Sequence, residues 1–338
     1  MSGAGVQLLH LTGSAESEEL AELSRLYAGG CLEATADPER YASAVAHVSP
    51  DGTWRFPADL SPAALAAAPP LPPAGALARI AALAPDVVVP QMFCLPGMTS
   101  YRALFDVLGI PYVGNTPAVM ALGADKAKAR AVVAAAGVDV PPGQLVRPGD
   151  EVRVAVPAVV KPVDADNSVG VALVREPGEL PAALAGAFAH SWAALVETYV
   201  ELGREVRCGV LDLDGELVAL PLEEYAVGTV RTREDKLARD ADGALRLVAK
   251  DATRAWIVDA DDPVTAAVHE AARRCHRALG CRHYGLFDFR IDPAGRPWFL
   301  EAGLYNSFSP QSVVTVMAEA AGIPLRDLYA RTLAEARG

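Results

Sequence analysis

The sequence has no long uninterrupted apolar run. Although 51% of its 338 residues are hydrophobic, no stretch approaches the roughly 20 apolar residues that a membrane-spanning helix needs. Its first residues, MSGAGVQLLHL, lack the basic flank and the long apolar core of a secretory signal peptide. These absences predict a cytoplasmic protein with no membrane partner.

Cysteine and positive charge are also scarce. The five cysteines are odd in number and scattered along the chain, which is typical of reduced thiols rather than a disulfide framework. The net charge of −12 repels nucleic-acid phosphates, and no basic stripe offsets it. We therefore expect no nucleic-acid partner, and we expect any bound phosphate to be met locally by a few lysines, a glycine loop or a metal.

Strand-like and helix-like segments alternate in the first third of the chain. GVQLLHLT at 5–12 predicts a strand, and the SAESEELAELSRLYAGG that follows predicts a capped helix ending at Gly29. APDVVVPQ at 84–91 is a short apolar run typical of a buried parallel strand. The alternation predicts an α/β domain over residues 1–115.

A second unit is predicted over residues 116–200. Thr116 followed by Pro117 favours a helix start, and that helix is expected to run through DKAKARAVVAAA and to stop at Gly137. The segments VDVPPGQLV, PAVVKPVDADNSVGVALV and AALVETYV read as strands joined by glycine or proline turns.

A third unit is predicted over residues 201–338. It opens with REVRCGVLDLDGELVALPL, a hairpin closed by Asp214-Gly215, and continues with a helix over about 263–279. A second hairpin, YGLFDFRID and PWFLEAGLYNS, follows that helix. The chain is thus expected to combine α/β and α+β parts in three domains.

The loop KPVDADNSVGV at 161–171 is a candidate phosphate site. Lys161 ends an apolar strand, and the small residues around Asn167, Ser168 and Gly170 allow backbone N–H groups to approach an anion. A plain hairpin loop with a solvated lysine explains this stretch equally well. Lys126, in GADKAKAR, is a second candidate cation that a solvated helix face would also explain.

Two acids follow in and after the strand ALVETYV. Glu197, expected to be exposed, and Val200 together suit an adenine, which offers an amino group and a flat apolar ring. Glu205 is placed to accept a hydrogen bond from a ribose hydroxyl. A strand end with solvent-facing acids is the alternative interpretation.

The last hairpin places a carboxylate on each strand among apolar neighbours. Burying Asp288 and Glu301 is costly unless something compensates their charge. Mg²⁺ does so, because it prefers one or two carboxylates together with phosphate oxygens and water. The alternative is a pair of salt bridges to Arg290 or Arg296.

The ordered series of these residues resembles the ATP-grasp superfamily, in particular its D-alanine–D-alanine ligase-like branch. The resemblance covers nearly the whole chain and implies a three-domain ligase that binds ATP between its central and C-terminal units. It also implies a role for each matching residue: Lys126 and Lys161 on the nucleotide phosphates, Asn167 and Ser168 in the phosphate lid, Glu197 and Val200 on adenine, Glu205 on ribose, Asp288 and Glu301 on Mg²⁺, and Lys236 on a loop near the γ-phosphate.

The chain departs from that branch where the acceptor binds. D-alanine ligases carry an asparagine where this chain has Gly303, so Asn306 is the candidate for that metal contact. They also carry an oxyanion-supporting arginine where this chain has Leu286, and Arg290 is the candidate replacement. Arg290, Lys236 and Ser168 are therefore the expected catalytic residues. Glu16 corresponds to an amine-binding glutamate, although its loop differs.

Further stretches resemble one subgroup, the ligase of mycosporine-like amino acid biosynthesis. These stretches are LSRLYAGGCLEATAD, WRFPADL, PQMFCLPGMTSYRALFDVLGIPYVGNTP, LPLEEY and FLEAGLYNSFSP. The resemblance implies that ATP phosphorylates the enaminone oxygen of mycosporine-glycine and that the amine of serine or threonine displaces phosphate, giving an imine, ADP and phosphate. It also implies substrate contact from residues 97–106 and a homodimer formed through the first domain.

Two other functions stay open. One is a D-alanine–D-alanine-type dipeptide or amino acid ligase of specialised metabolism. The other is a nucleotide-binding regulator that has lost turnover. A zinc site in CHRALGCRHYG is disfavoured because its spacing matches no common pattern, and Cys94 is expected to be a small buried residue rather than a nucleophile.

Overall fold

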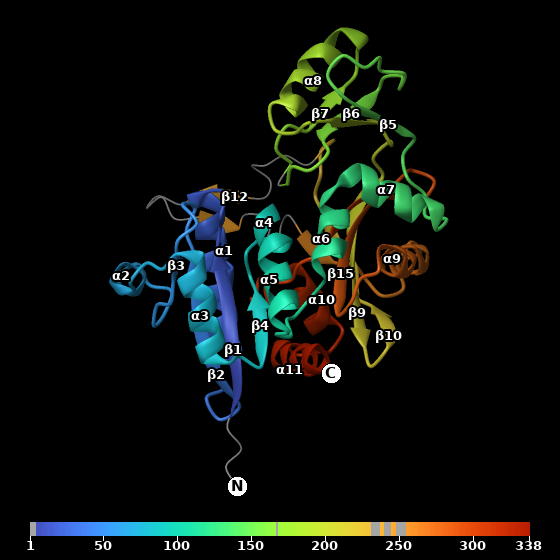
Figure 1. Cartoon of the computed structure of the whole chain (residues 1–338). Helices are drawn as coiled ribbons and strands as arrows, with labels where there is room; N and C mark the ends of the chain where they lie inside the picture. The colour runs from blue at the N-terminus through green and yellow to red at the C-terminus, as the bar shows by residue number, and fades with distance from the viewer. Residues whose placement is uncertain (1–4, 167, 231–236, 240–244, 248–254) are drawn as a thin grey trace.

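The structure is a computed structural model that describes residues 5–166, 168–230, 237–239, 245–247 and 255–338. In this part of the chain, the strands form three larger sheets and one two-stranded ribbon. Figure 1 shows the N-terminal elements on one side, most of the C-terminal elements on the other, and a small lobe above them.

The N-terminal sheet has the strand order β3-β2-β1-β4. β1 pairs in parallel with both β2 and β4, as the alternation of strands and helices predicts. Apolar side chains from its strands, including Leu9, Leu11 and Val88, pack with Phe105 and Trp54. The elements of this region are β1 (Val6–Gly13), α1 (Glu18–Ala34), β2 (Tyr41–Val48), β3 (Trp54–Arg55), α2 (Pro62–Ala67), α3 (Pro73–Leu83), β4 (Val87–Pro90), α4 (Leu95–Met98) and α5 (Ser100–Leu108).

The prediction that the first helix ends at Gly29 is wrong. The helix is N-capped by Ser17, and it continues through Gly29 and Gly30 to Ala34. A Cβ atom at Gly30 would lie 2.7 Å from Oγ of Ser309, so glycine lets the helix approach the C-terminal part of the chain closely. The packing of the helix, rather than the local cost of glycine, therefore sets its length.

The small lobe is an antiparallel sheet with the order β5-β8-β6-β7. Val146, Val160 and Val196 form its core with Ala187 from the covering helix α8. Figure 1 shows this lobe standing apart at the top of the molecule. Its elements are β5 (Gly143–Val146), β6 (Ala158–Pro162), β7 (Ala172–Val174), η1 (Pro177–Glu179), α8 (Leu180–Phe188) and β8 (Ala194–Thr198).

The single helix expected between Thr116 and Gly137 is two helices, α6 (Pro117–Ala124) and α7 (Lys126–Ala135). They meet at Asp125, whose extended backbone ends α6 and whose carboxylate accepts the N–H of Lys128 at 3.0 Å. An aspartate in this role stabilises a helix start. Both helices pack against the large C-terminal sheet, on β16, although they were expected in the second unit.

The large sheet has the order β14-β11-β9-β15-β16, and β10 pairs with β9 in the hairpin predicted at Asp214-Gly215. Separately, β12 and β13 form the two-stranded ribbon. The elements of this region are β9 (Arg204–Leu213), β10 (Glu216–Ala219), β11 (Glu223–Tyr225), β12 (Leu237–Arg239), β13 (Leu245–Leu247), β14 (Ala255–Ile257), α9 (Thr265–Leu279), β15 (Tyr284–Ile291), β16 (Pro297–Gly303), α10 (Val313–Ala320) and α11 (Leu325–Arg337).

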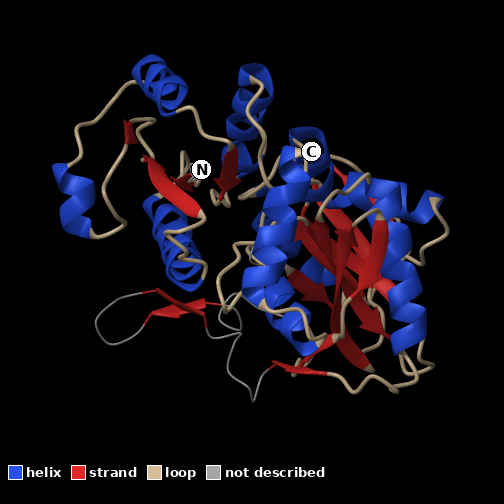
Figure 2. Ribbon diagram, turned by 90° about the horizontal axis from the view of Figure 1, so that it is seen from below, coloured by secondary structure: helices blue, strands red, loops and turns tan. Residues whose placement is uncertain are grey.

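The two faces of this sheet have different roles. Because side chains alternate along a strand, Phe287 and Phe289 point to one face, where they pack against α9. Leu286 and Asp288 point to the opposite face, and there Leu286 shares a core with Met317 of α10. Figure 2 shows the large sheet with helices on both sides. The face that carries Asp288 is the one that builds the site.

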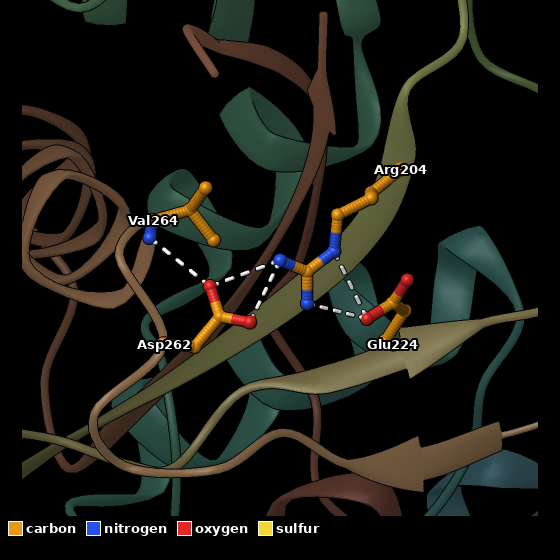
Figure 3. Close-up of polar contacts among 4 residues, drawn as sticks. All are labelled: Arg204, Glu224, Asp262 and Val264. Carbon is orange, nitrogen blue, oxygen red and sulfur yellow. Dashed lines mark hydrogen bonds and ion pairs between the residues drawn. The ribbon is translucent and has the colours of Figure 1, made fainter. Parts of the chain in front are cut away.

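Arg204 fixes the beginning of β9. Its guanidinium pairs with Glu224 on β11 at 2.6 Å and with Asp262 at 2.8 Å, and Asp262 also accepts the N–H of Val264 just before α9 (Figure 3). This network holds three segments together on one face of the strand. The alternating residue Glu205 then points to the other face, toward the site.

The expected domain boundaries stay a prediction. The strands of the three larger sheets fall within 1–115, 116–200 and 201–338, whereas α6 and α7 pack across the second of these boundaries. Asn115 connects the first range to the third, because its side-chain amide donates to the carbonyls of Tyr284 and Leu304. Among the helices that the structure describes, none combines the length and apolarity needed to cross a membrane.

Candidate functional site

Two cavities share a border at the last hairpin. The large cavity, about 640 Å³, lies between α1, α4, α6 and the β15–β16 hairpin. The small cavity, about 90 Å³, lies between the small lobe and the beginning of β9. Lys126, Ala165, Asp288 and Glu301 line both cavities.

A β-bulge places the two carboxylates at this border. Asp288 pairs with Glu301, but the next pair is Phe289 with Phe299, so Leu300 is the extra residue. Without the bulge, Phe299 and Glu301 would share a face because they are two residues apart. With it, Phe299 packs on Phe289 in the core while Glu301 joins Asp288 at the cavities.

Nine of the residues predicted to bind or act on ATP line the small cavity together. The prediction that Glu197 is exposed is wrong, because the residue is 3% exposed. Its carboxylate pairs with Lys161 at 2.5 Å and with Arg130 at 3.2 Å. The residues brought together are Lys126, Lys161, Ser168, Glu197, Val200, Glu205, Asp288, Arg290 and Glu301.

Arg290 does not take the place expected for an oxyanion-supporting residue. Of the two cavities, Arg290 lines the small one. Its guanidinium donates to Glu205 at 2.9 Å and to the carbonyls of Val200 and Thr229. Glu205 is its direct cross-strand partner, so strand pairing holds Arg290 beside the predicted ribose site. Leu286, by contrast, lines the large cavity.

The salt bridges named as an alternative for Asp288 and Glu301 are not the ones observed. Arg290 pairs with Glu205, and Arg296 pairs with Asp139 at 2.5 Å. The arginine beside Asp288 is Arg207, at 2.9 Å. Sequence reasoning missed Arg207, although its position two residues after Glu205 places it on the same strand face.

The lysine and the loop of the phosphate site are in contact. Nζ of Lys126 donates to the carbonyl of Ala165, and the backbone N–H of Lys126 donates to Val163 at 2.8 Å. Ser168 has a left-handed backbone, φ 59°, and lines the small cavity. Asn167 and Lys236, also predicted here, lie outside the described residues.

Asn306 is not placed as a metal ligand. It is buried, it lines neither cavity, and its Oδ1 accepts from Oγ of Ser312 at 2.5 Å and from the N–H of Phe308. Ser312 itself lines the large cavity. The acceptor oxygen of the asparagine is thus occupied by hydrogen bonds within its own loop, which it stabilises beside the large cavity.

Aromatic residues that sequence reasoning did not single out line the large cavity. Phe93 packs edge-on against Tyr27 at 5.5 Å and tilted against Tyr305 at 5.1 Å between ring centroids. The hydroxyl of Tyr305 donates to Asp166 of the phosphate loop at 3.4 Å, and this links the cavity wall to the lobe above. Sequence distance hides this cluster, because its members come from three separate segments.

Other predicted residues also reach the large cavity. Glu16 lines it, and burial raises the pKa of this carboxyl while a backbone hydrogen bond opposes that change. Cys94 is buried at the start of α4, as expected. From residues 97–106, Met98 lines the cavity, whereas Arg102 is buried and donates to Val113 and Asn115.

Solved structures share the fold of this chain. The D-alanine–D-alanine ligase from Coxiella burnetii matches with a TM-score of 0.76 at 20% identity, covering 98% of this chain and 94% of that one. The VanG D-Ala:D-Ser ligase from Enterococcus faecalis matches with a TM-score of 0.76 at 19% identity, covering 98% and 100%. The predicted mixed α/β, ATP-grasp fold is confirmed.

Sequence relatives then define the family. A family model described as "D-ala D-ala ligase C-terminus" matches residues 148–334. The D-alanine–D-alanine ligase of Mycolicibacterium smegmatis is 31% identical over 340 residues, 91% of this chain and 90% of the relative, and that of Citrifermentans bemidjiense is 32% identical over 238 residues, 69% and 73%. The chain belongs to the D-alanine–D-alanine ligase family, which confirms the prediction of an ATP-grasp ligase.

Proposed function

We propose that the protein is an ATP-dependent carbon–nitrogen ligase that binds adenosine in the small cavity and its acceptor in the large one. The observation that carries this proposal is the shared border, because Lys126, Asp288 and Glu301 line both cavities. A γ-phosphate entering from one side would meet there an acceptor oxygen entering from the other. Phosphoryl transfer depends mainly on such positioning and on charge neutralisation.

The reaction has two steps. A lone pair of the acceptor oxygen forms a bond to the γ-phosphorus, and the bond to ADP breaks with its electron pair leaving on ADP. The amine nitrogen of the amino acid then attacks the carbon that bears the phosphorylated oxygen, and the carbon–oxygen bond breaks with its electron pair on the oxygen. Inorganic phosphate leaves and takes up the proton that the amine nitrogen loses. Lys126 and Lys161 neutralise the nucleotide phosphates, and Glu197 holds Lys161 in place.

The donor set at the border fits Mg²⁺. Asp288 and Glu301 are direct cross-strand partners facing both cavities, and Mg²⁺ suits one or two carboxylates completed by phosphate oxygens and water. These two residues would hold the ion, which neutralises charge on the phosphates when bound. Asn306 is left out of this set because its acceptor oxygen is already engaged.

We propose mycosporine-glycine as the acceptor, with serine or threonine as the amine. Leu286 and Gly303 line the large cavity without adding charge to it, and Tyr27, Phe93 and Tyr305 line it with aromatic rings. Such a lining suits a flat conjugated ring better than the small side chain of alanine. Its volume lies within the range of small-molecule sites.

The second candidate is a dipeptide ligase that joins two D-amino acids. The comparisons favour this candidate over mycosporine-glycine, because the matched relatives carry the name D-alanine–D-alanine ligase. Glu16 lines the large cavity and would hold an amine in either reaction. A homodimer formed through the first domain stays a prediction.

ADP release by the purified protein separates these functions. We expect Mg²⁺-dependent release with mycosporine-glycine plus serine or threonine, together with a new imine absorbance, and none with paired D-alanine. Release with D-alanine alone would select the second candidate. Glu301→Gln should lower turnover by orders of magnitude. If the wild-type protein binds ATP but turns over none of these substrates, the nucleotide-binding regulator is favoured instead.

A further inference from the structure

Arg207 lies directly across from Asp288 in the sheet. The two residues are cross-strand partners on β9 and β15, and Nε of Arg207 donates to the Asp288 carboxylate at 2.9 to 3.0 Å. The arginine side chain is 13% exposed. Its guanidinium lies over the ring of Tyr225, 4.6 Å from the centroid, and the Tyr225 hydroxyl donates to Glu223 at 2.5 Å. The guanidinium is therefore held from two sides.

Arg207 lines the large cavity, which is the proposed acceptor site. Among the described residues, one lysine and one arginine line the large cavity, namely Lys126 and Arg207. Lys126 also lines the small cavity, whereas Arg207 does not. Arg290, on the same sheet face, lines the small cavity instead. Within the described part of the chain, Nη1 and Nη2 of Arg207 make no hydrogen bond, so both groups can donate to a ligand.

The charge of Arg207 is secure. The guanidinium of an arginine stays protonated in proteins, and the Asp288 carboxylate 2.9 Å from Nε of Arg207 favours its cationic form. Arg207 is thus a permanent cation that cannot exchange protons with a substrate.

We propose that Arg207 is a catalytic residue that binds the acceptor oxygen receiving the phosphoryl group. The position two residues before Asp288 on the same face, Leu286, lines the large cavity without a charged side chain. The neighbouring strand supplies a positive charge through Arg207. A buried, preorganised donor aimed at developing charge is an effective way to lower a reaction barrier.

This role rests on the proposed ligase function. While the acceptor oxygen bonds to phosphorus and ADP departs with the electron pair, the Nη groups of Arg207 donate to that oxygen. When the carbon–oxygen bond breaks, the same oxygen leaves as part of phosphate with the electron pair, and Arg207 stabilises its negative charge. Arg207 stays protonated in both steps.

Arg207→Met and Arg207→Ala in the full-length protein test this role, with Arg290→Met as the matched control. We expect Arg207→Met to lower kcat for ADP release by about 10²- to 10³-fold while leaving the KM for ATP within about threefold. For Arg290→Met we expect the KM for ATP to rise by a larger factor than kcat falls, because Arg290 lies beside the predicted ribose site. Added guanidinium should restore part of the activity of Arg207→Ala, which a loss of folding could not explain.

Three results would overturn the proposal. An Arg207→Met protein with kcat within threefold of the wild type, or with a raised KM for ATP alone, would exclude contact with the reacting oxygen. Failure of guanidinium to rescue an Arg207→Ala protein that still binds ATP by calorimetry would do the same. Release of ADP by the wild-type protein without any acceptor would reject the ligase function together with this role. This result comes from the wild-type protein alone, so it cannot be confused with the two results on the Arg207 variants.

Discussion

The ion pair between Glu205 and Arg290 offers a direct test of how the wall of the small cavity is stabilised. Its side chains are only 8% and 6% exposed, and they meet at 2.9 Å across β9 and β15. Replacing Glu205 by glutamine keeps the shape and removes the charge, which leaves the Arg290 cation buried without its counterion. The pair of Asp139 and Arg296 is the matched control, because its side chains are 43% and 52% exposed.

The expected magnitude follows from the burial of each pair. Removing one partner of a buried ion pair costs about 3–5 kcal/mol, whereas an exposed pair contributes about 0–1 kcal/mol. Arg290 keeps its hydrogen bonds to Val200 and Thr229 and its contact with the Tyr199 ring. We therefore place Glu205→Gln at the lower end, about 3 kcal/mol, and Asp139→Asn below about 1 kcal/mol.

Urea unfolding without nucleotide, followed by circular dichroism and by fluorescence, measures both variants. The double variant Glu205→Gln with Arg290→Met should lose less stability than the sum of the two single variants, because no unpaired charge remains buried. Equal losses for Glu205→Gln and Asp139→Asn, or strictly additive losses in the double variant, would refute the reasoning from burial.

Two further predictions concern packing and pH. Gly30→Ala should destabilise the protein by about 1–3 kcal/mol, because its Cβ would lie 2.7 Å from Oγ of Ser309. Gly29→Ala has open space around it and should stabilise the helix by up to about 1 kcal/mol. Thermal unfolding measures both variants, and equal effects on stability would contradict the packing argument. Burial lowers the pKa of His10 to about 4 despite its hydrogen bond to Gln91, so the unfolded state, with a pKa near 6.5, binds more protons between these values. The free energy of unfolding should therefore fall as pH drops from about 6.5 to about 4. His10→Asn should make this fall smaller. Unfolding midpoints of both proteins at pH 7.5 and 5 test this, and an equal fall in both would contradict it.

Local sequence signals determined the elements, and the resemblance to ATP-grasp ligases singled out many of the residues that line the small cavity. Val87–Pro90 forms a strand because it is a short apolar run, and Asp214-Gly215 closes a hairpin because both residues accept a left-handed backbone. Nine predicted residues, from Lys126 to Glu301, converge on one small cavity. Their roles toward phosphate, adenine and metal stay predictions that the family resemblance implies.

Tertiary structure decided what depends on strand register and on segments far apart in the sequence. Glu197 is buried because Lys161 and Arg130 meet it from other elements, and α1 continues past Gly29 because its packing outweighs the local cost of glycine. The bulge at Leu300 reverses the alternation of β16 and turns Glu301 toward the cavities. The same pairing places Arg207 opposite Asp288, a neighbour 81 residues away. Sequence periodicity reports which residues share a face of one strand, but only the pairing between strands decides which charges meet.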